Sequence, residues 1–384
     1  MGVDRKMDEK TGTLRKQRGR ASVVFENPPL IMAAASTVGK KEGDGPLGVF
    51  FDRVELDPML GKKSWEEAES ELQSRTAGLV IEKSGLSKEE IRYSFAGDLL
   101  AQLIATSFGN INLEIPMFGL YGACSTMGEG LGLGAMCVEG GFADHVLVGA
   151  SSHFASAEKQ FRFPLGYGNQ RAQSATWTVT GCGAVVLESG SEMKREGACS
   201  EKNSETAMKQ AETGGNGMGR KNHRFRVAVT GITTGKLVDM GTKDSMNMGA
   251  AMAPAAWNTI CQNFEDFGVG ASYYDRIITG DLGAVGQKAL LDFMKSSGHD
   301  ITGKHMDCGL EIYDRGEQDV HSGGSGCGCS AVTLCAHILP KLMRGEWNRV
   351  LFVPTGALLS TVSYNEGQSI PGIAHAVMLE RMEV

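Results

Sequence analysis

Residues 116–141 carry the sequence that decides the fold, PMFGLYGACSTMGEGLGLGAMCVEGG. A short apolar strand, Met117–Leu120, enters a tight Gly-Ala-Cys-Ser turn and then a helix of mostly small residues. A helix with so little bulk fits where neighbouring elements approach closely, so we expect it deep inside the protein. Cys124 begins this helix, where backbone N–H groups and the helix dipole favour a thiolate. A small buried hydrophobic role for Cys124 remains equally open.

A second copy of this pattern lies in the other half of the chain. There Gly328-Cys-Ser-Ala precedes the helical segment VTLCAHILPKLMRG, which is followed by an apolar strand beginning at Arg349. Cys124 and Cys329 occupy matching places in the two copies. Each copy is closed by a similar strand, GAVVLE at residues 183–188 and HAVMLE at residues 375–380. Such internal similarity indicates a repeated structural unit.

Shifts in composition divide the chain into four parts. Residues 1–20 form a polar N-terminal tail, and residues 21–189 form a first αβ block. Residues 190–224 are charged, rich in glycine and nearly free of large apolar side chains, which is typical of a linker. Residues 225–384 form a second αβ block.

Within the blocks, apolar strands alternate with helical stretches. The strands include Val227–Ile232, Arg276–Thr279 and Val350–Pro354, and the helices include Trp65–Ser84 and Gly283–Ser296. The strands are too apolar to have a face in water, so we expect a sheet covered by helices on both sides. Two such halves predict a layered α/β/α/β/α arrangement. In addition, Ser64 is expected to cap the helix at Trp65, with Glu67 in the capping-box position.

Composition and charge exclude several classes of protein. The net charge of −7 argues against nucleic acid as the main partner, because phosphate binding needs a basic face. Nine cysteines, an odd number with several in apolar runs, indicate a reducing compartment rather than a disulfide framework. No stretch of 18 apolar residues is present, and the basic N-terminus lacks an apolar segment. We therefore expect a soluble protein without a transmembrane segment or signal peptide.

Four separated segments resemble a known family. They are GLYGACSTMGEGL, SSHFASAEKQFRFP, ITGDLGAVG and HSGGSGCGCSAVTLC, in this order. Together with the duplication they resemble the thiolases and ketoacyl-acyl-carrier-protein synthases, and more closely the stage V sporulation protein AD family of endospore-forming bacteria. The resemblance covers roughly residues 20–189 and 225–384. It implies a thiolase fold, with duplicated βαβαβαββ halves in five layers.

The segment Val320-His-Ser-Gly-Gly-Ser-Gly-Cys-Gly-Cys-Ser resembles the thiolase stretch whose histidine sits beside the nucleophilic cysteine. The resemblance implies that His321 lies across the site from Cys124, as a base or hydrogen-bond donor. The spacing is one residue shorter than usual, and a loop histidine that satisfies backbone groups is the alternative.

The cysteines of this segment raise the question of a metal. Cys327 and Cys329 together with Cys335 and His337 have the residue types of a zinc site. However, Ser330–Leu342 is predicted to be a buried helix, so we expect no metal site.

The chain lacks some of the catalytic residues that thiolases and condensing enzymes carry. Thiolases carry a second cysteine in a Cys-x-Gly turn, where this chain has Val353-Pro-Thr-Gly-Ala. Condensing enzymes carry a second histidine or an asparagine near the segment that is Thr279-Gly-Asp-Leu-Gly here. Because acyl transfer needs a proton relay as well as a nucleophile, we expect this chain not to be an ordinary acyltransferase.

The third segment, residues 151–164, follows a core strand and should point towards a ligand crevice. Lys159 and Arg162 could clamp a carboxylate, and the aromatic rings of Phe161, Phe163 and Tyr167 could stack on a planar ring. The alternative is a surface loop with solvated charges.

The resemblance therefore implies a protein that binds dipicolinic acid, or its calcium chelate, within the stage V sporulation channel complex. Its role would be dipicolinate uptake into the developing spore, and its release in germination. The alternatives are a thiolase-like acyltransferase that uses Cys124 with His321, and a structural subunit with a vestigial pocket. The expected ligand-binding residues are Cys124, Ser152, His153, Lys159, Phe161, Arg162, His321, Gly324 and Ser325.

The same resemblance implies partners and a location. No cofactor is required, and Ca2+ would enter only as part of the bound chelate. The expected partners are dipicolinic acid, the integral membrane subunits of the stage V sporulation protein A channel and a second copy of the chain, with no nucleic acid. The protein would lie peripherally at the forespore or spore inner membrane.

Overall fold

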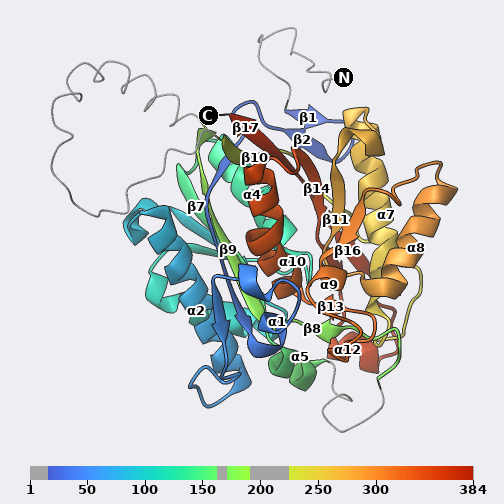
Figure 1. Cartoon of the computed structure of the whole chain (residues 1–384), viewed down its shortest axis with the longest axis horizontal. Coiled ribbons are helices and arrows are strands. Elements are labelled where there is room, and N and C mark those ends of the chain that lie inside the picture. The colour runs from blue at the N-terminus through green and yellow to red at the C-terminus, as the bar shows by residue number, and fades with distance from the viewer. Residues whose placement is uncertain (1–15, 162–170, 191–224, 384) are drawn as a thin grey trace.

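The computed structural model describes residues 16–161, 171–190 and 225–383 (Figure 1). The predicted linker at residues 190–224 lies outside the described residues apart from Gly190 at its border. The predicted N-terminal tail is partly described, and its end is structured. Residues Gln17–Arg18 form strand β1, which pairs antiparallel with β2 (Ser22–Val24), so the folded region begins earlier than residue 21.

The elements of the first half are β3 (Leu30–Gly39), α1 (Lys40–Gly43), β4 (Arg53–Glu55), α2 (Trp65–Ser84), β5 (Tyr93–Gly97), α3 (Ile104–Asn110), β6 (Met117–Gly119), α4 (Thr126–Glu139), β7 (His145–Ser152), α5 (Phe154–Gln160), β8 (Trp177–Thr178) and β9 (Gly181–Glu188). Those of the second half are β10 (Phe225–Thr233), α7 (Met248–Phe267), β11 (Arg276–Thr279), α8 (Gly283–Ser296), β12 (His305–Asp307), α9 (Cys308–Glu311), β13 (Gly324–Ser325), α10 (Cys327–Thr333), the π-helix η8 (Leu334–Ile338), α11 (Leu339–Arg344), β14 (Arg349–Val353), β15 (Thr355–Ala357), α12 (Thr361–Asn365), β16 (Gly372–Ala374) and β17 (Ala376–Glu383).

The two halves have the same strand order. The first half is ordered β6-β5-β7-β9-β3 and the second β12-β11-β14-β17-β10. In each half the first three strands are parallel and the last two run antiparallel to their neighbours. β3 and β10 join the halves through a short antiparallel pairing of Leu30 with Ala228 and Ile31 with Val227. The duplication predicted from the sequence is thus a duplication of sheet topology.

Helices cover both faces of the sheets (Figure 1). α2 packs on β3, β7 and β9 at one outside, and α7 packs with α8 at the other. α4 and α10 lie between the halves, where α4 contacts β5 and β7 of the first half and β10 and β17 of the second. This is the predicted α/β/α/β/α layering.

The small residues of α4 are required by this central position. A Cβ added at Gly130 would lie 2.8 Å from Val148, and one at Gly128 would lie 3.0 Å from the carbonyl oxygen of His375. Side chains there would push the layers apart. The helix is short of bulk because both of its faces are occupied, as the sequence predicted.

The longest helices of the two halves also match. α2 and α7 each span 20 residues and end at a glycine in the left-handed region, Gly85 and Gly268. Ser64 caps α2 as predicted, since its hydroxyl accepts the N–H of Glu67 at 3.2 Å. The Glu67 carboxylate accepts the N–H of Lys63 rather than that of Ser64. Among the helices that the structure describes, none is both long and apolar enough to cross a membrane.

Candidate functional site

The turn before α4 places Cys124 in a constrained position. Ala123 adopts a positive φ of 47°, which is unusual for a residue with a side chain. The turn is held by its own polar groups: the Ser125 hydroxyl donates to the Gly122 carbonyl (2.7 Å), and the Thr126 hydroxyl donates to that of Ala123 (2.6 Å). Cys124 lies two residues before the first helical residue, Thr126, and does not occupy the first turn of the helix. Local strain of this kind is typical of functional sites.

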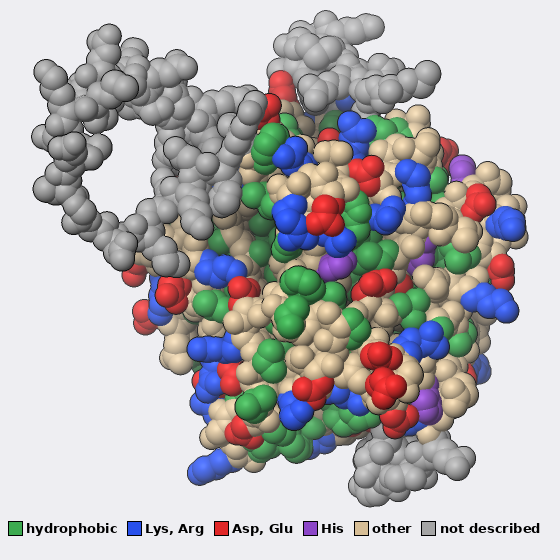
Figure 2. Space-filling model, viewed as in Figure 1, with side chains coloured by type: hydrophobic (Ala, Val, Ile, Leu, Met, Phe, Trp, Pro, Cys, Tyr) green, Lys and Arg blue, Asp and Glu red, His purple; other side chains and the backbone are tan. Residues whose placement is uncertain are grey.

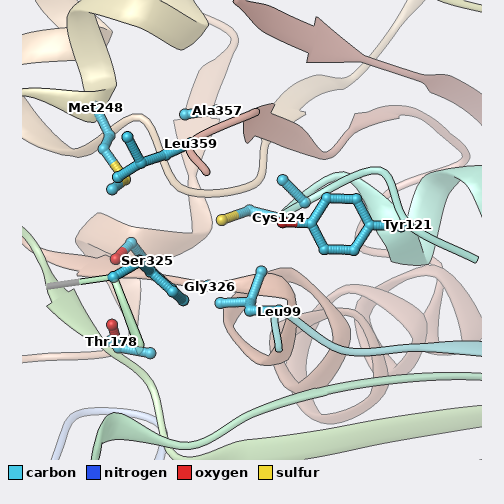
Figure 3. A pocket seen from close by; sticks show the side chains of 11 residues that line it. Leu99, Tyr121, Cys124, Thr178, Met248, Ser325, Gly326, Ala357 and Leu359 are labelled. Atoms are coloured by element: carbon cyan, nitrogen blue, oxygen red, sulfur yellow. The ribbon is translucent and has the colours of Figure 1, made fainter. Parts of the chain in front are cut away.

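Cys124 lies on the wall of a small pocket (Figure 3). About 340 Å3 in and around the pocket is not filled by protein atoms, and this space includes the part that is open to solvent. Figure 3 shows the sulfur of Cys124 pointing into the space between Met248, Leu359 and Ser325. The lining residues are Leu99, Tyr121, Ala123, Cys124, Phe161, Thr178, Met248, Ser325, Gly326, Ala357 and Leu359.

Both halves contribute to this pocket. The first half supplies the turn around Cys124 and the strand β8, and the second half supplies β13 and β15. β8 and β13 pair in parallel, with Ser325 opposite Thr178, so two hydroxyl side chains come from neighbouring strands. On the other side, a Cβ on Gly356 of β15 would lie 2.3 Å from the Gly122 carbonyl oxygen and 3.2 Å from the Cys124 nitrogen. Only glycine allows β15 to approach the turn this closely.

Three of the predicted ligand-binding residues line the pocket: Cys124, Phe161 and Ser325. Gly324 is the neighbour of Ser325 in β13 and pairs with Trp177 of β8. It contributes backbone structure to the wall and not a surface of the pocket.

Two other predicted residues, Ser152 and His153, are hydrogen-bonded to backbone groups near the pocket. The Ser152 hydroxyl donates to the carbonyl of Val179 (2.7 Å) and accepts the N–H of Gly328 (3.1 Å), so it ties the β8 and α10 segments together. His153 is buried and caps α5, because its Nδ1 accepts the N–H of Ala155 (3.1 Å). Burial lowers the pKa of His153. Both side chains are committed to the fold, and neither is on the described pocket lining.

The predicted charged residues are not on the described lining either. The Lys159 ammonium pairs with Glu66 at 2.7 Å and is largely exposed, which agrees with the surface-loop alternative for this residue. Arg162, Phe163 and Tyr167 lie outside the described residues.

His321 does not lie across the described pocket from Cys124. Its Nδ1 donates to the carbonyl of Ala172 (2.9 Å), and its Nε2 lies 3.2 Å from the Asp319 carboxylate. Asp319 and His321 both have positive φ values, 47° and 50°, and His321 is not among the residues of the described lining. The arrangement matches the loop histidine that satisfies a backbone group. The residue that faces Cys124 from this segment is Ser325.

Cys327, Cys329 and Cys335, the three cysteines considered as zinc ligands, have structural roles. The thiols of Cys327, Cys329 and Cys335 are buried and donate to the carbonyls of Ser151 (2.7 Å), Gly280 (3.5 Å) and Ala184 (3.6 Å). Burial raises the pKa of all three thiols. Within the residues that the structure describes, no group of three His, Cys, Asp or Glu side chains could hold a metal ion.

Sequence reasoning missed the buried carboxyl groups behind the pocket. In the first half, Glu69 accepts the hydroxyls of Ser151 (2.9 Å) and Ser156 (2.6 Å), and burial together with the nearby Asp98 raises its pKa to about 8. In the second half, burial raises the pKa of Asp307 to about 7. The sequence carries a signal only for the neighbouring aspartates Asp98 and Asp281, since the tripeptide Gly-Asp-Leu begins at the last residue of β5, Gly97, and again at Gly280 directly after β11.

The chemistry of the described lining favours binding over group transfer. Leucine, methionine, phenylalanine and tyrosine side chains form apolar walls, and Thr178, Ser325 and Cys124 add hydrogen-bonding groups. The described lining has no histidine, carboxylate or amide that could relay a proton to or from Cys124. Burial and the nearby thiols raise the pKa of Tyr121 to about 12, so this phenol stays protonated.

Comparison with known proteins identifies the family. The family model for stage V sporulation protein AD (SpoVAD) matches residues 19–380. The chain belongs to the stage V sporulation protein AD family. Stage V sporulation protein AD of Bacillus subtilis (strain 168) is 40% identical over 366 residues, which cover 95% of this chain and 98% of that protein. Membership of this family gives the chain a role in sporulation.

Solved structures show that the stage V sporulation protein AD fold is thiolase-like. OleA from Xanthomonas campestris aligns over 93% of this chain and 99% of its own, with a TM-score of 0.55 and 14% identity. The 3-oxoacyl-[acyl-carrier-protein] synthase III of Aquifex aeolicus VF5 aligns over 92% of this chain and 99% of its own, with a TM-score of 0.51 and 12% identity. At such low identity the likeness establishes the fold alone.

Proposed function

We propose that this chain binds dipicolinic acid, or its calcium chelate, in the pocket beside Cys124. The observation that carries the proposal is the composition of this pocket. Its walls are apolar and close together, and its hydrogen-bonding groups come from Cys124, Thr178 and Ser325 on different strands and turns. A planar aromatic ring suits the walls, and carboxylate groups suit donors at the ends.

The two carboxylates also require positive charge. The described lining contains no lysine or arginine. We assign this charge to calcium within the chelate and to Arg162, which lies outside the described residues. A bidentate guanidinium or a divalent ion would each offset the cost of bringing the carboxylates into an apolar pocket.

The alternative is acyl transfer by Cys124. In its favour, the sulfur points into the pocket from a strained turn (Figure 3). Against it, His321 makes its contacts elsewhere, and the described lining offers no other proton relay. Incubation with acyl-coenzyme A and intact mass spectrometry distinguishes the two: we expect no thioester, and a stoichiometric adduct on Cys124 would favour the enzyme.

The proposed setting is the stage V sporulation protein A channel at the forespore membrane. Here the chain would dock on integral membrane subunits, support dipicolinate uptake into the developing spore and take part in its release during germination. Family membership supports this setting, since the role in sporulation is shared.

A homodimer is part of the proposal. β6 forms the edge of the first-half sheet, and the side chains of Met117 and Phe118 on it are exposed. Phe108 of α3 is exposed beside it, and α3 contacts β6. An open strand edge with apolar side chains pairs readily with the same edge of a second copy about a twofold axis. Analytical ultracentrifugation should find a dimer that Phe108→Asp weakens; a monomeric wild-type chain would contradict this part.

Isothermal titration calorimetry with dipicolinate, with and without calcium, tests the binding proposal. The wild-type chain should release or take up heat with one site per chain. Ser325→Ala should weaken binding about tenfold or more, because a hydrogen bond to a charged group is worth roughly 1.5–3 kcal/mol.

A matched serine provides the control. Ser272 is exposed and lies just before β11, at the end of the sheet opposite the pocket, so Ser272→Ala should leave the affinity unchanged. An absence of heat under both conditions, or equal effects of the two substitutions, would count against the proposed site.

A further inference from the structure

Asp281 is a buried carboxylate that bridges two walls of the pocket. It follows β11 and is completely buried. Its Oδ2 accepts the N–H of Gly326 at 2.9 Å, and its Oδ1 accepts the hydroxyl of Thr355 at 2.8 Å. Its own N–H lies 3.3 Å from the same Thr355 oxygen, to which it donates. One side chain thus joins segments that are far apart in the sequence.

Both partners of Asp281 belong to the pocket. Gly326 lines it directly, beside Ser325, and has a positive φ of 105° that leaves its N–H directed at the carboxylate. Thr355 begins β15, which continues through Gly356, packed against the Cys124 turn, to Ala357 on the lining. The distance between these walls sets the width of the space in front of Cys124.

We propose that Asp281 is the positioning residue that holds the Ser325–Gly326 and Thr355–Ala357 walls at a fixed separation in front of Cys124. It acts through these backbone segments and does not itself touch the ligand. The expected change in dipicolinate affinity rests on the proposed function, whereas the expected change in the alkylation rate of Cys124 does not.

The neighbouring carboxylate has a different task. Asp307 accepts the Thr279 hydroxyl (2.6 Å) and the N–H groups of Leu282 (2.9 Å) and Gly283 (3.0 Å), so it secures the turn from β11 into α8. None of these bonds reaches a pocket wall. The positioning of the walls therefore depends on Asp281 rather than on the acidic pair as a whole.

The matching aspartate of the first half provides a natural control. Asp98 stands in the same Gly-Asp-Leu context after β5 and is equally buried. Its bonds go to the N–H of Leu100 (2.7 Å) and to the N–H and hydroxyl of Thr106 (2.7 and 2.6 Å), which are all in its own segment. It stabilises one loop and joins no distant walls.

The test compares Asp281→Asn with Asp98→Asn. Asparagine keeps the size of the side chain but is neutral and has one acceptor oxygen, so where that oxygen keeps the Gly326 N–H, the NH2 group can only donate to the Thr355 hydroxyl. In Asp281→Asn weaker neutral bonds therefore replace the charge-assisted bonds to both walls. The walls should separate more often, and Cys124 should react with iodoacetamide about tenfold faster through local opening. Dipicolinate affinity should fall by a similar factor. Asp98→Asn affects only its own loop, which includes Leu99 of the lining, and both quantities should change less than in Asp281→Asn.

Two further measurements separate positioning from general stability. Peptide mass spectrometry after alkylation should show that Cys335, which is buried away from the pocket, stays protected in Asp281→Asn. Thr355→Val removes both bonds between Thr355 and Asp281 but leaves the Oδ2 contact with Gly326, so it should give an intermediate rate at Cys124. Thr355→Ser keeps the hydroxyl and should give the wild-type rate. If Asp281→Asn does not fold, the comparison of Thr355→Val with Thr355→Ser still tests whether the bonds between Asp281 and Thr355 limit access to Cys124.

The outcomes are distinct. An unchanged Cys124 rate in both Asp281→Asn and Thr355→Val, or equal exposure of Cys335 and Cys124, would overturn the inference. If the wild-type chain binds no dipicolinate, the proposed function fails, while the alkylation rates still decide the role of Asp281.

Discussion

The two halves of the molecule have the same strand order and matching helices, yet they contribute differently to the pocket. The first half presents the thiol of Cys124 to the pocket from a turn in which Ala123 has a positive φ. In the second half the matching Cys329 is fully buried and bonded to the Gly280 carbonyl, and the strands around it form the opposing walls. The aspartates of the two Gly-Asp-Leu motifs differ in the same way, since Asp98 bonds locally and Asp281 bonds across the site. The two halves therefore share the layers of the fold, and they differ in what the loops after matching strands contribute to the pocket.

The largest expected effect concerns the buried carboxyl groups of the two halves. Burial raises the pKa of Glu69 to about 8 and that of Asp307 to about 7, whereas carboxyl groups in the unfolded chain titrate near 4. The folded protein therefore binds more protons than the unfolded chain, and the stability present at low pH is lost as the pH rises through these values. Each group should lower the free energy of unfolding by at most about 1.4 kcal/mol per pH unit.

The carboxyl groups of the two halves can be distinguished by the pH range in which each affects the free energy of unfolding. Between pH 7 and 8 Glu69 contributes more to the slope than Asp307, so Glu69→Gln should flatten the stability curve there more than Asp307→Asn does. Below pH 7 both substitutions should reduce the slope. Urea unfolding at several pH values measures the slopes, and identical curves for the wild type and Glu69→Gln would show that the first-half carboxyl does not change its protonation on folding.

The next effect concerns the contact between the halves at the Cys124 turn. In Gly356→Ala the new Cβ would lie 2.3 Å from the Gly122 carbonyl oxygen and 3.1 Å from the Ser125 nitrogen, both of which are backbone atoms. Forcing this contact should cost about 2–3 kcal/mol of unfolding free energy. The control is Gly78→Ala in α2, where nothing lies within 4 Å and alanine should stabilise the helix by roughly 0.5–1 kcal/mol. Urea midpoints that move together in the two variants would argue against a tight contact.

The smallest effect compares the caps of the matching helices α2 and α7. Ser64→Ala removes the cap of α2 and should cost about 1 kcal/mol, with no change in dipicolinate affinity. Asn247→Ala removes a longer bond, 3.4 Å to the N–H of Ala250, and should cost about the same or less. Because Met248 follows directly and lines the pocket, only the second change should also weaken dipicolinate binding. Urea unfolding and calorimetry on both variants measure the stability and the dipicolinate affinity. Equal affinities in the two variants would contradict a link between the α7 cap and the pocket.

Much of the fold was predictable from local signals. The bounds of Trp65–Ser84, Gly283–Ser296 and Arg276–Thr279 agree with the structure, because caps and apolar periodicity mark these elements in the chain itself. The five-layer arrangement followed from the repeated pattern around Cys124 and Cys329, since a helix of small residues needs a covered position on both faces.

The site was less predictable, because it depends on how loops turn. His321 was expected opposite Cys124, but backbone angles at Asp319 and His321 direct its ring to the Ala172 carbonyl. Aspartate and histidine adopt positive φ values more often than most non-glycine residues, but their presence in the sequence does not show which turn will use them. Ser325 and Phe161 were predicted and do line the pocket, whereas Met248 and Leu359 join it from segments that carry no recognisable motif. The bridging role of Asp281 required knowing which distant backbone groups it meets.

A crystal structure of the chain with calcium and dipicolinate would show whether dipicolinate binds in the pocket beside Cys124. We expect the aromatic ring to lie between the apolar walls of the pocket, with a carboxylate within hydrogen-bonding distance of Ser325 and one edge against the Cys124 sulfur. An empty pocket at saturating ligand, or dipicolinate bound on another surface, would contradict it.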